Sequence, residues 1–146
     1  MKKPDDIKIK KILTEAKTIA VVGLSAKPHR ASYRVAEYMQ KEGYRIIPVN
    51  PSLKQEVLGE RAYPDLASVP EKIDIVNIFR KSEDVPAVVE DALPVNPRCI
   101  WMQLGIVNEG AAARATENGI AVIMDLCLMV EHKRILGAST CGEGNL

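Results

Sequence analysis

The stretch Thr18-Ile-Ala-Val-Val-Gly-Leu-Ser-Ala-Lys-Pro-His-Arg30 decides the fold, because it leads from a buried strand through a glycine turn into a helix. The small and β-branched residues 18–22 are typical of a parallel strand covered on both faces. Gly23 ends that strand, where a side chain would obstruct a close approach to the backbone. Apolar residues then recur at helical spacing over 31–42. A strand, a glycine turn and a helix N-terminus flanked by basic residues favour an anion site, and we expect a phosphate there.

Short apolar strands and helices continue to alternate along the chain. The pattern predicts strands over 18–22, 44–50, 72–79, 98–102 and 120–124, and helices over 4–16, 31–42, 82–92, 108–118 and 125–134, with a helical turn near 65–68. Ser82 and Asn108 are the expected N-caps of two of these helices. Strands alternating with helices predict an α/β protein with a three-layer, doubly wound, Rossmann-like fold and a five-stranded, mostly parallel sheet. We expect one domain over 1–136, with 1–16 as a leading helix, and a flexible tail over 137–146.

Composition narrows the classes of protein that fit. A net charge of +1 over 146 residues argues against a nucleic-acid partner, which usually needs a basic excess. The polar N-terminus indicates no signal peptide, and no apolar run approaches the roughly 20 residues of a membrane span. Cys99, Cys127 and Cys141 are odd in number and form no C-x-x-C pair, which favours reduced thiols in a cytoplasmic protein. The two histidines and three cysteines have no metal-site spacing.

The expected carboxyl ends of the strands carry a mixture of cations and apolar groups. In a parallel sheet these ends share one edge, where ligands bind. Basic residues follow two of the strands: Lys27, Arg30, Arg80 and Lys81. Converging cations in a nearly neutral protein indicate a ligand with several phosphates. Apolar residues at the same edge suit an adenine or an alkyl arm: Pro48, Val49, Phe79, Met102 and Leu104.

A nicotinamide dinucleotide fits this edge poorly. The G-x-G-x-x-G fingerprint would require glycine at positions 25 and 28, where the chain has Ser25 and Pro28. It would also require an acidic residue after the second strand to bind the ribose diol, and the chain has Val49-Asn50-Pro51 there. Both departures disfavour NAD.

Five segments, in order, resemble the small single-domain CoA-binding proteins. They are Val21-Val-Gly-Leu-Ser-Ala-Lys-Pro-His-Arg30, Gly43-Tyr44, Ile47-Pro-Val-Asn-Pro51, Asp74-Ile-Val with Phe79-Arg80, and Trp101-Met-Gln-Leu-Gly105. The resemblance covers about 15–135 and implies the CoA-binding Rossmann-like domain that also forms the N-terminus of the succinyl-CoA ligase α subunit. It implies that CoA is the bound ligand, whose 3′-phosphate and pyrophosphate suit the cations.

The resemblance also implies the site residues. Gly23, Ser25, Lys27 and Arg30 would hold phosphates; Pro48, Val49, Asn50, Phe79 and Arg80 would surround the nucleotide; Met102, Gln103 and Gly105 would line the crevice for the pantetheine arm. Most of these residues also have a purely structural interpretation. Glycine, serine and asparagine are common in turns, lysine and arginine are mostly solvated, and a lone phenylalanine often packs in a core. We expect Trp101 in the core, Cys127 as a small buried apolar residue, and His132 exposed near a helix C-terminus.

The favoured function is a non-catalytic binding or regulatory module for CoA or an acyl-CoA, because no nucleophile–base pair is visible. An NAD(P)-binding oxidoreductase and a CoA-handling subunit of a ligase-type enzyme remain alternatives. A regulatory protein whose CoA-loaded state is recognised by another protein is a third. We expect neither nucleic acid nor membrane as a partner, and the resemblance leaves a homodimer or an unidentified protein partner open.

Overall fold

The helices and strands follow the order expected from the sequence. The computed structural model describes residues 4–137, so 138–146 of the expected tail lie outside the described residues. The elements are α1 (Pro4–Glu15), β1 (Thr18–Val22), α2 (Ala31–Lys41), β2 (Arg45–Val49), η1 (Leu66–Ser68), β3 (Ile75–Ile78), η2 (Ser82–Asp84), α3 (Val85–Ala92), β4 (Cys99–Met102), α4 (Glu109–Glu117), β5 (Ala121–Ile123), α5 (Leu128–His132) and η3 (Lys133–Gly137).

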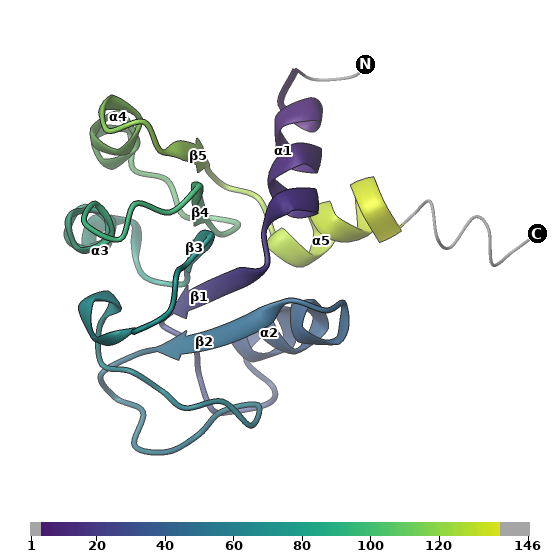
Figure 1. The fold of residues 1–146 in the computed structure, drawn as a ribbon, viewed down its shortest axis with the longest axis vertical. Helices are drawn as coiled ribbons and strands as arrows, with labels where there is room; N and C mark the ends of the chain where they lie inside the picture. Colours follow the sequence, from purple (N-terminus) through teal and green to yellow (C-terminus); the bar gives the residue numbers. More distant parts are fainter. Residues whose placement is uncertain (1–3, 138–146) are drawn as a thin grey trace, which may run out of the picture.

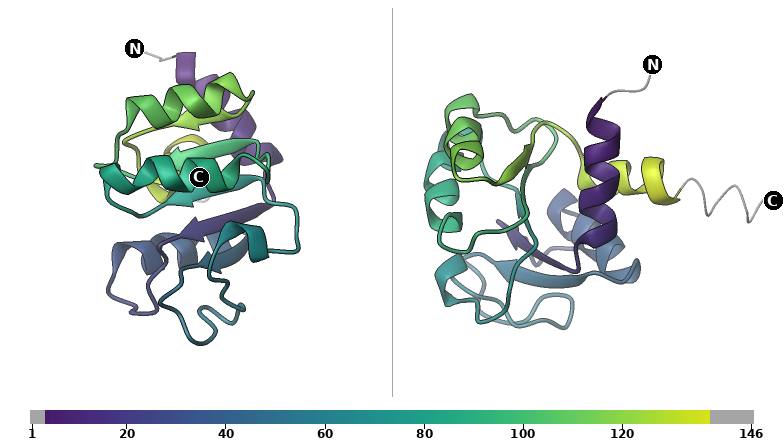
Figure 2. Two further views of the ribbon diagram at one scale, coloured as in Figure 1. Left: turned by 90° about the vertical axis from the view of Figure 1, so that its left-hand side faces the viewer. Right: turned by 45° about the horizontal axis from the view of Figure 1, so that its top comes forward.

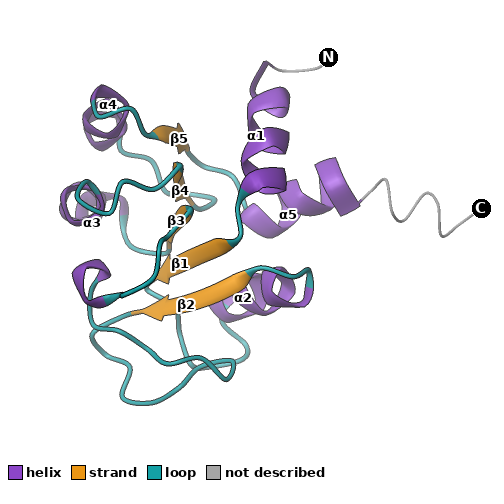
Figure 3. Ribbon diagram, in the orientation of Figure 1, coloured by secondary structure: helices purple, strands orange, loops and turns teal. Residues whose placement is uncertain are grey.

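The five strands form one parallel sheet in the order β2-β1-β3-β4-β5 (Figures 1 and 3). In the register, Val22 at the end of β1 lies beside Val49 of β2 and Ile78 of β3. The carboxyl ends of these three strands therefore meet at the same edge. The expected doubly wound α/β fold is confirmed.

Two apolar layers hold helices against the two faces of the sheet (Figure 2). One layer contains residues of α1, α2 and α5 together with Val21, Ile75 and Trp101 from the strands. The other contains residues of α3 and α4 together with Val22 and Ile78. Burial on both faces explains why the strands read as continuous apolar runs. Trp101 is fully buried, as expected.

The strand order reverses between β1 and β3, which sets the position of a crevice. After β1 the chain enters α2 on one face, and after β3 it enters α3 on the other face (Figure 1). Neighbouring strands whose connections leave in opposite directions open a gap at their carboxyl ends. Gly23 lies in this gap with φ +92°, and a Cβ there would come within 2.3 Å of the Phe79 carbonyl oxygen.

Ser82 is not the N-cap of an α-helix, contrary to the expectation from the sequence. The segment 82–92 divides into the 3-10 turn η2 and the helix α3. The Ser82 hydroxyl instead accepts from the Val107 N–H at 3.0 Å, a contact between segments far apart in sequence. The Asn108 cap is confirmed, because its side chain accepts from the Ala111 N–H at 2.9 Å.

His132 is buried at 5% exposure, so the expectation of an exposed histidine was wrong. Its Nδ1 lies 2.7 Å from the Tyr38 hydroxyl, and the rings of Tyr38 and Tyr44 contact it edge-on at 5.4 and 5.7 Å between centroids. Sequence spacing could not reveal this cluster, because its members come from α2, the segment before β2, and α5. Burial holds the pKa of His132 below its usual value.

Gly23→Ala should destabilise the protein more than Gly119→Ala. Both glycines have positive φ, so both substitutions incur backbone strain of about 1–2 kcal/mol. Only position 23 adds a contact with backbone, because nothing lies within 4 Å of a Cβ at 119. We expect an additional loss of about 1–3 kcal/mol in the free energy of unfolding for Gly23→Ala, measured by urea denaturation. Equal losses for the two variants would contradict the close approach.

Stability should fall between about pH 7.5 and about pH 5.5 in a way that depends on His132. Because its folded-state pKa is lowered, the unfolded chain binds the proton more readily. The stabilisation is thus present above the unfolded pKa, near 6.5, and is lost as the pH falls below it towards the folded pKa. Urea unfolding at the two pH values should show a larger decrease for the wild type than for His132→Gln. A decrease of the same size in the variant would rule out this origin.

Candidate ligand-binding site at the carboxyl edge of the sheet

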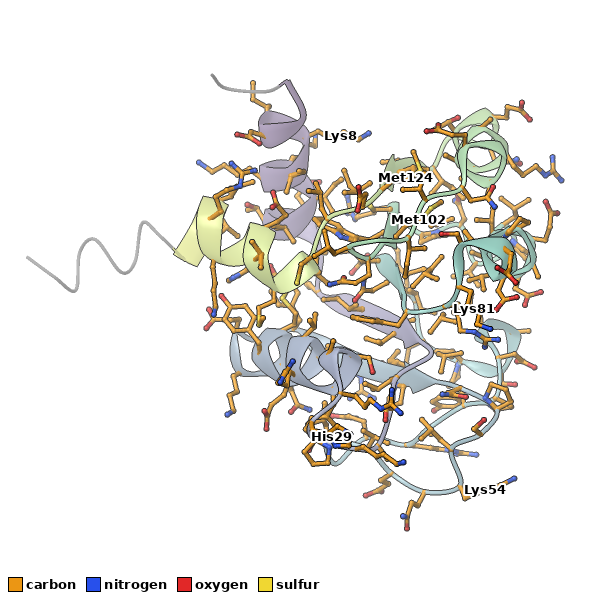
Figure 4. The ribbon with its side chains drawn as sticks, turned by 180° about the vertical axis from the view of Figure 1, so that it is seen from behind. Lys8, His29, Lys54, Lys81, Met102 and Met124 are labelled. Carbon is orange, nitrogen blue, oxygen red and sulfur yellow. The ribbon has the colours of Figure 1, made fainter. Side chains whose placement is uncertain are left out.

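The loop 23–30 is exposed apart from its first residues, and internal hydrogen bonds shape it. The Ser25 N–H donates to the Ser32 Oγ at 3.0 Å, and the Ser25 Oγ accepts from the Lys27 N–H at 3.0 Å. Figure 4 shows His29 in this loop, far from Lys8 on α1. Helix α2 follows without a side-chain cap and without an acidic residue in its first turn. Its N-terminal N–H groups and its dipole therefore favour an anion.

The basic residues near this edge have fewer carboxylate partners than four arginines that lie far from it. Four remote arginines each lie within 3.0 Å of a carboxylate: Arg45, Arg98, Arg114 and Arg134. Within 4–137, Lys27, Arg30 and Arg34 form no ion pair, and Arg80 has only the Asp84 carboxylate at 3.7 Å. Within the described residues, therefore, no close carboxylate neutralises the cations at the start of α2, and Arg80 at the end of β3 has only a distant one.

Two cavities flank Arg80 at the switch point. The larger, of about 530 Å³, opens on the α2 and α5 face, and the smaller, of about 340 Å³, opens on the α3 face. The larger is lined by apolar side chains and three cations: Ala31, Val35, Phe79, Leu104, Ile106, Cys127 and Met129, with Arg34, Arg80 and Lys81, and with Gln103. The smaller has Val22, Val49 and Leu66 among its lining residues and a rim of carboxylates: Asp65, Glu83, Asp84 and Asp91. Arg80 lines both cavities and can reach a ligand that spans them.

Gln103 is the polar group held most firmly in the larger cavity. It is 6% exposed, and its Oε1 accepts from the Asn77 Nδ2 at 3.2 Å and from the Leu128 N–H at 3.3 Å. Its backbone is fixed as well, because its carbonyl oxygen accepts from the Ile106 N–H at 2.8 Å. The side chain therefore has one defined orientation.

The structure brings together part of the residue set implied by the resemblance. Phe79, Arg80 and Gln103 line the larger cavity, and Val49 lines the smaller one. The residues of the loop, from Gly23 through Ser25 and Lys27 to Arg30, line neither cavity; the loop connects Val22 of the smaller cavity to Ala31 of the larger.

The side chains of Pro48 and Met102 are not at either cavity. Met102 is fully buried in the apolar layer beneath α3 and α4, and Pro48 is buried within β2 (Figure 4 labels Met102). Successive side chains of a strand point to opposite faces, so Met102 packs in the core while Gln103 lies at the larger cavity.

Asn50 and Gly105 have structural contacts of their own. Asn50 Nδ2 donates to the Leu24 carbonyl at 3.1 Å and its Oδ1 accepts from the Ser52 N–H at 2.9 Å, so Asn50 joins the exits of β1 and β2. Gly105 has φ +84°, and its N–H donates to Asp125 Oδ1 at 2.7 Å. Its neighbours Leu104 and Ile106 line the larger cavity, whereas Gly105 supports the turn between them.

The sequence reasoning missed Arg34, Ile106 and Met129 as lining residues and Asn77 as the partner of Gln103. Arg34 had a usable signal, because a residue one turn into α2 faces the same side as the helix start. Met129 and Asn77 had none, since α5 reaches the cavity only through tertiary packing and Asn77 lies inside an apolar strand.

Within the described residues the thiols and histidines suggest no separate reactive centre. Cys99 is buried, and burial raises the pKa of its thiol to about 12. Cys127 is half-buried at the larger cavity, where we had expected a buried apolar residue. No cluster of three or more metal-ligating side chains occurs over 4–137, and no helix in that range is long and apolar enough to cross a membrane.

Comparison with known proteins identifies the family. Residues 17–133 match the CoA binding domain. The uncharacterized protein YneT of Bacillus subtilis is 48% identical over 132 residues, covering 90% of this chain and 97% of YneT. A hypothetical protein from Pyrococcus horikoshii superposes with a TM-score of 0.88 at 36% identity, covering 94% of this chain and 98% of the other.

A larger enzyme also contains a related segment. The α subunit of the ADP-forming acetate–CoA ligase I of Pyrococcus furiosus is 31% identical over 84 residues, which is 54% of this chain and 18% of that subunit. The chain thus has a full-length relative of similar size and also resembles a part of a ligase subunit. Together with the parallel sheet and its switch-point crevice, the match over most of the chain shows that this protein belongs to the CoA-binding domain family.

Proposed function

We propose that the protein binds coenzyme A or an acyl-CoA across the switch point, as a non-catalytic binding or regulatory module. The observation that carries this proposal is the group of unneutralised cations around an uncapped helix N-terminus, beside a large apolar cavity. A ligand with several phosphates at one end and a long, mostly apolar arm at the other complements that arrangement.

The parts of CoA can be assigned by chemistry. The phosphates suit the loop 23–30 and the start of α2, where Lys27, Arg30 and Arg34 lack carboxylate partners within 4–137. The pantetheine arm suits the larger cavity, in which Phe79 and Gln103 lie. Adenosine suits the smaller cavity, because its apolar floor can hold the ring and its carboxylates can accept from the exocyclic amine. Arg80 would then lie between the two arms of the ligand.

The regulatory interpretation rests on the residues at this edge. Within the described residues, no histidine or thiol at the cavity is hydrogen-bonded to a neighbouring base. The similarity to a ligase subunit supports the alternative that the chain hands CoA to a partner enzyme. Turnover with a ligase-type partner, and none alone, would favour that alternative over a purely regulatory role.

Affinity should depend on the 3′-phosphate. We expect CoA to bind at least tenfold more tightly than dephospho-CoA, because the extra phosphate adds charge-assisted contacts to Lys27 and Arg30, which form no ion pair within 4–137. Little binding of NAD is expected. Isothermal titration calorimetry at fixed, moderate salt measures all three. Equal affinities for CoA and dephospho-CoA would contradict the role of the cations.

Lys27→Glu should weaken CoA binding by about ten- to a hundredfold, because it places a negative charge beside the phosphates. Lys72→Glu makes the same change in net charge on an exposed residue before β3, at the opposite edge of the sheet, and serves as the control. Both variants should keep the wild-type melting temperature within a degree or two, since exposed substitutions rarely change stability strongly. A similar loss of affinity in both would indicate only a general electrostatic effect.

A further inference from the structure

The orientation of the Gln103 carboxamide follows from a backbone contact. The Leu128 N–H donates to Gln103 Oε1 at 3.3 Å, and a backbone N–H can only donate. The end of the amide that faces Leu128 must therefore be the oxygen. Asn77 Nδ2 donates to the same oxygen at 3.2 Å, so two inner donors hold it away from the cavity.

The amide nitrogen of Gln103 is consequently the end available to a ligand. Gln103 lines the larger cavity, and over residues 4–137 its Nε2 makes no hydrogen bond. This nitrogen is also not sealed in the core, because Asn77 Oδ1 is the one fully buried side-chain polar atom without a partner in the described part of the chain. The cavity thus presents N–H donors among apolar side chains.

The side chains around Gln103 indicate which kind of ligand acceptor would suit its amide nitrogen. Val35, Phe79, Ile106 and Met129 line the same cavity. A phosphate would pair with the cations that line other parts of this cavity, Arg34, Arg80 and Lys81, whereas the Gln103 amide offers a neutral donor. A neutral carbonyl oxygen loses less hydration and takes the Gln103 donor as its partner.

Asn77 is an unusual residue for its place. It lies at 0% exposure in the middle of β3, between two apolar strands, and its Oδ1 is left without a donor over residues 4–137. An unpaired buried acceptor is unfavourable, so a purely apolar side chain would pack there at lower cost. Its Nδ2 donates to the Trp101 carbonyl oxygen at 3.4 Å and to Gln103 Oε1 at 3.2 Å, so Asn77 links the Gln103 side chain to the backbone of β4.

We infer that Asn77 is a positioning residue which, with the Leu128 N–H, fixes Gln103 as a donor to a neutral carbonyl oxygen of the bound ligand. This rests on the proposed function and extends it. CoA supplies such an oxygen in the amides of its pantetheine arm, and an acyl-CoA supplies another in its thioester. The two sources are separable by experiment.

A double-mutant cycle on ligand binding tests the inference. Asn77→Leu, Gln103→Met and the double variant are titrated with CoA, acetyl-CoA and 3′,5′-ADP, which lacks the pantetheine arm. We expect Asn77→Leu and Gln103→Met each to weaken the carbonyl-bearing ligand by about three- to tenfold and to leave 3′,5′-ADP unchanged. In the Gln103→Met background, Asn77→Leu should have no further effect, because it acts through Gln103. Asn77→Ala replaces Asn77→Leu if the latter fails to fold.

The pattern of losses identifies the carbonyl. A loss shared by CoA and acetyl-CoA assigns a pantetheine amide, and a loss confined to acetyl-CoA assigns the thioester. Additive effects in the cycle, or an equal loss for 3′,5′-ADP, would overturn the role of Asn77. Wild-type protein that binds neither CoA nor acetyl-CoA would instead overturn the proposed function, and with it the assignment of the carbonyl.

A measurement without ligand tests the positioning role of Asn77 independently of whether the protein binds CoA. The side-chain amide signals of Gln103, assigned by their loss in Gln103→Met, should be one sharp pair in the NMR spectrum of the wild type. Asn77→Leu should broaden or double that pair, because the carboxamide loses one of the donors that fix it. An unchanged pair would refute the positioning role whatever the ligand.

Discussion

The close approach of Gly23 to the carbonyl of Phe79 is the constraint on which the rest of the structure depends. It lies where the strand order reverses, so the ends of β1 and β3 are neighbours while their connections leave towards opposite faces. Any Cβ at position 23 would separate these backbones, because it would lie only 2.3 Å from the Phe79 carbonyl oxygen. The cavities, the exposed loop and the position of Arg80 between them all follow from that packing.

Charge distribution turns this edge into a candidate site. Arginines far from it, such as Arg45 and Arg134, are neutralised by close carboxylates, and this raises their pKa values further. Around the start of α2, by contrast, Lys27 and Arg30 have no such partners within 4–137. A protein with a net charge of only +1 can therefore attract phosphates locally without being a general polyanion binder.

Several residues at this edge are held in place by hydrogen bonds within the chain. Ser25 shapes the loop by accepting from the Lys27 N–H, and Asn50 joins the exits of two strands with both polar ends of its side chain. Such contacts preorganise the loops, which lowers the entropy lost when a ligand binds. Gln103 is the clearest case, since Asn77 and the Leu128 N–H orient it in the absence of ligand. The same residue lines the larger cavity.

The sequence by itself determined the order of elements, the parallel sheet and the edge at which cations gather, because strand and helix periodicities and the glycine turn are local properties of the chain. Only the tertiary structure decided which face each side chain occupies. Met102 is turned into the core while Gln103 reaches the cavity, and His132 is enclosed by two tyrosines from other elements. These outcomes depend on contacts between residues distant in sequence. The periodicity of one segment does not show which other segment will pack against it.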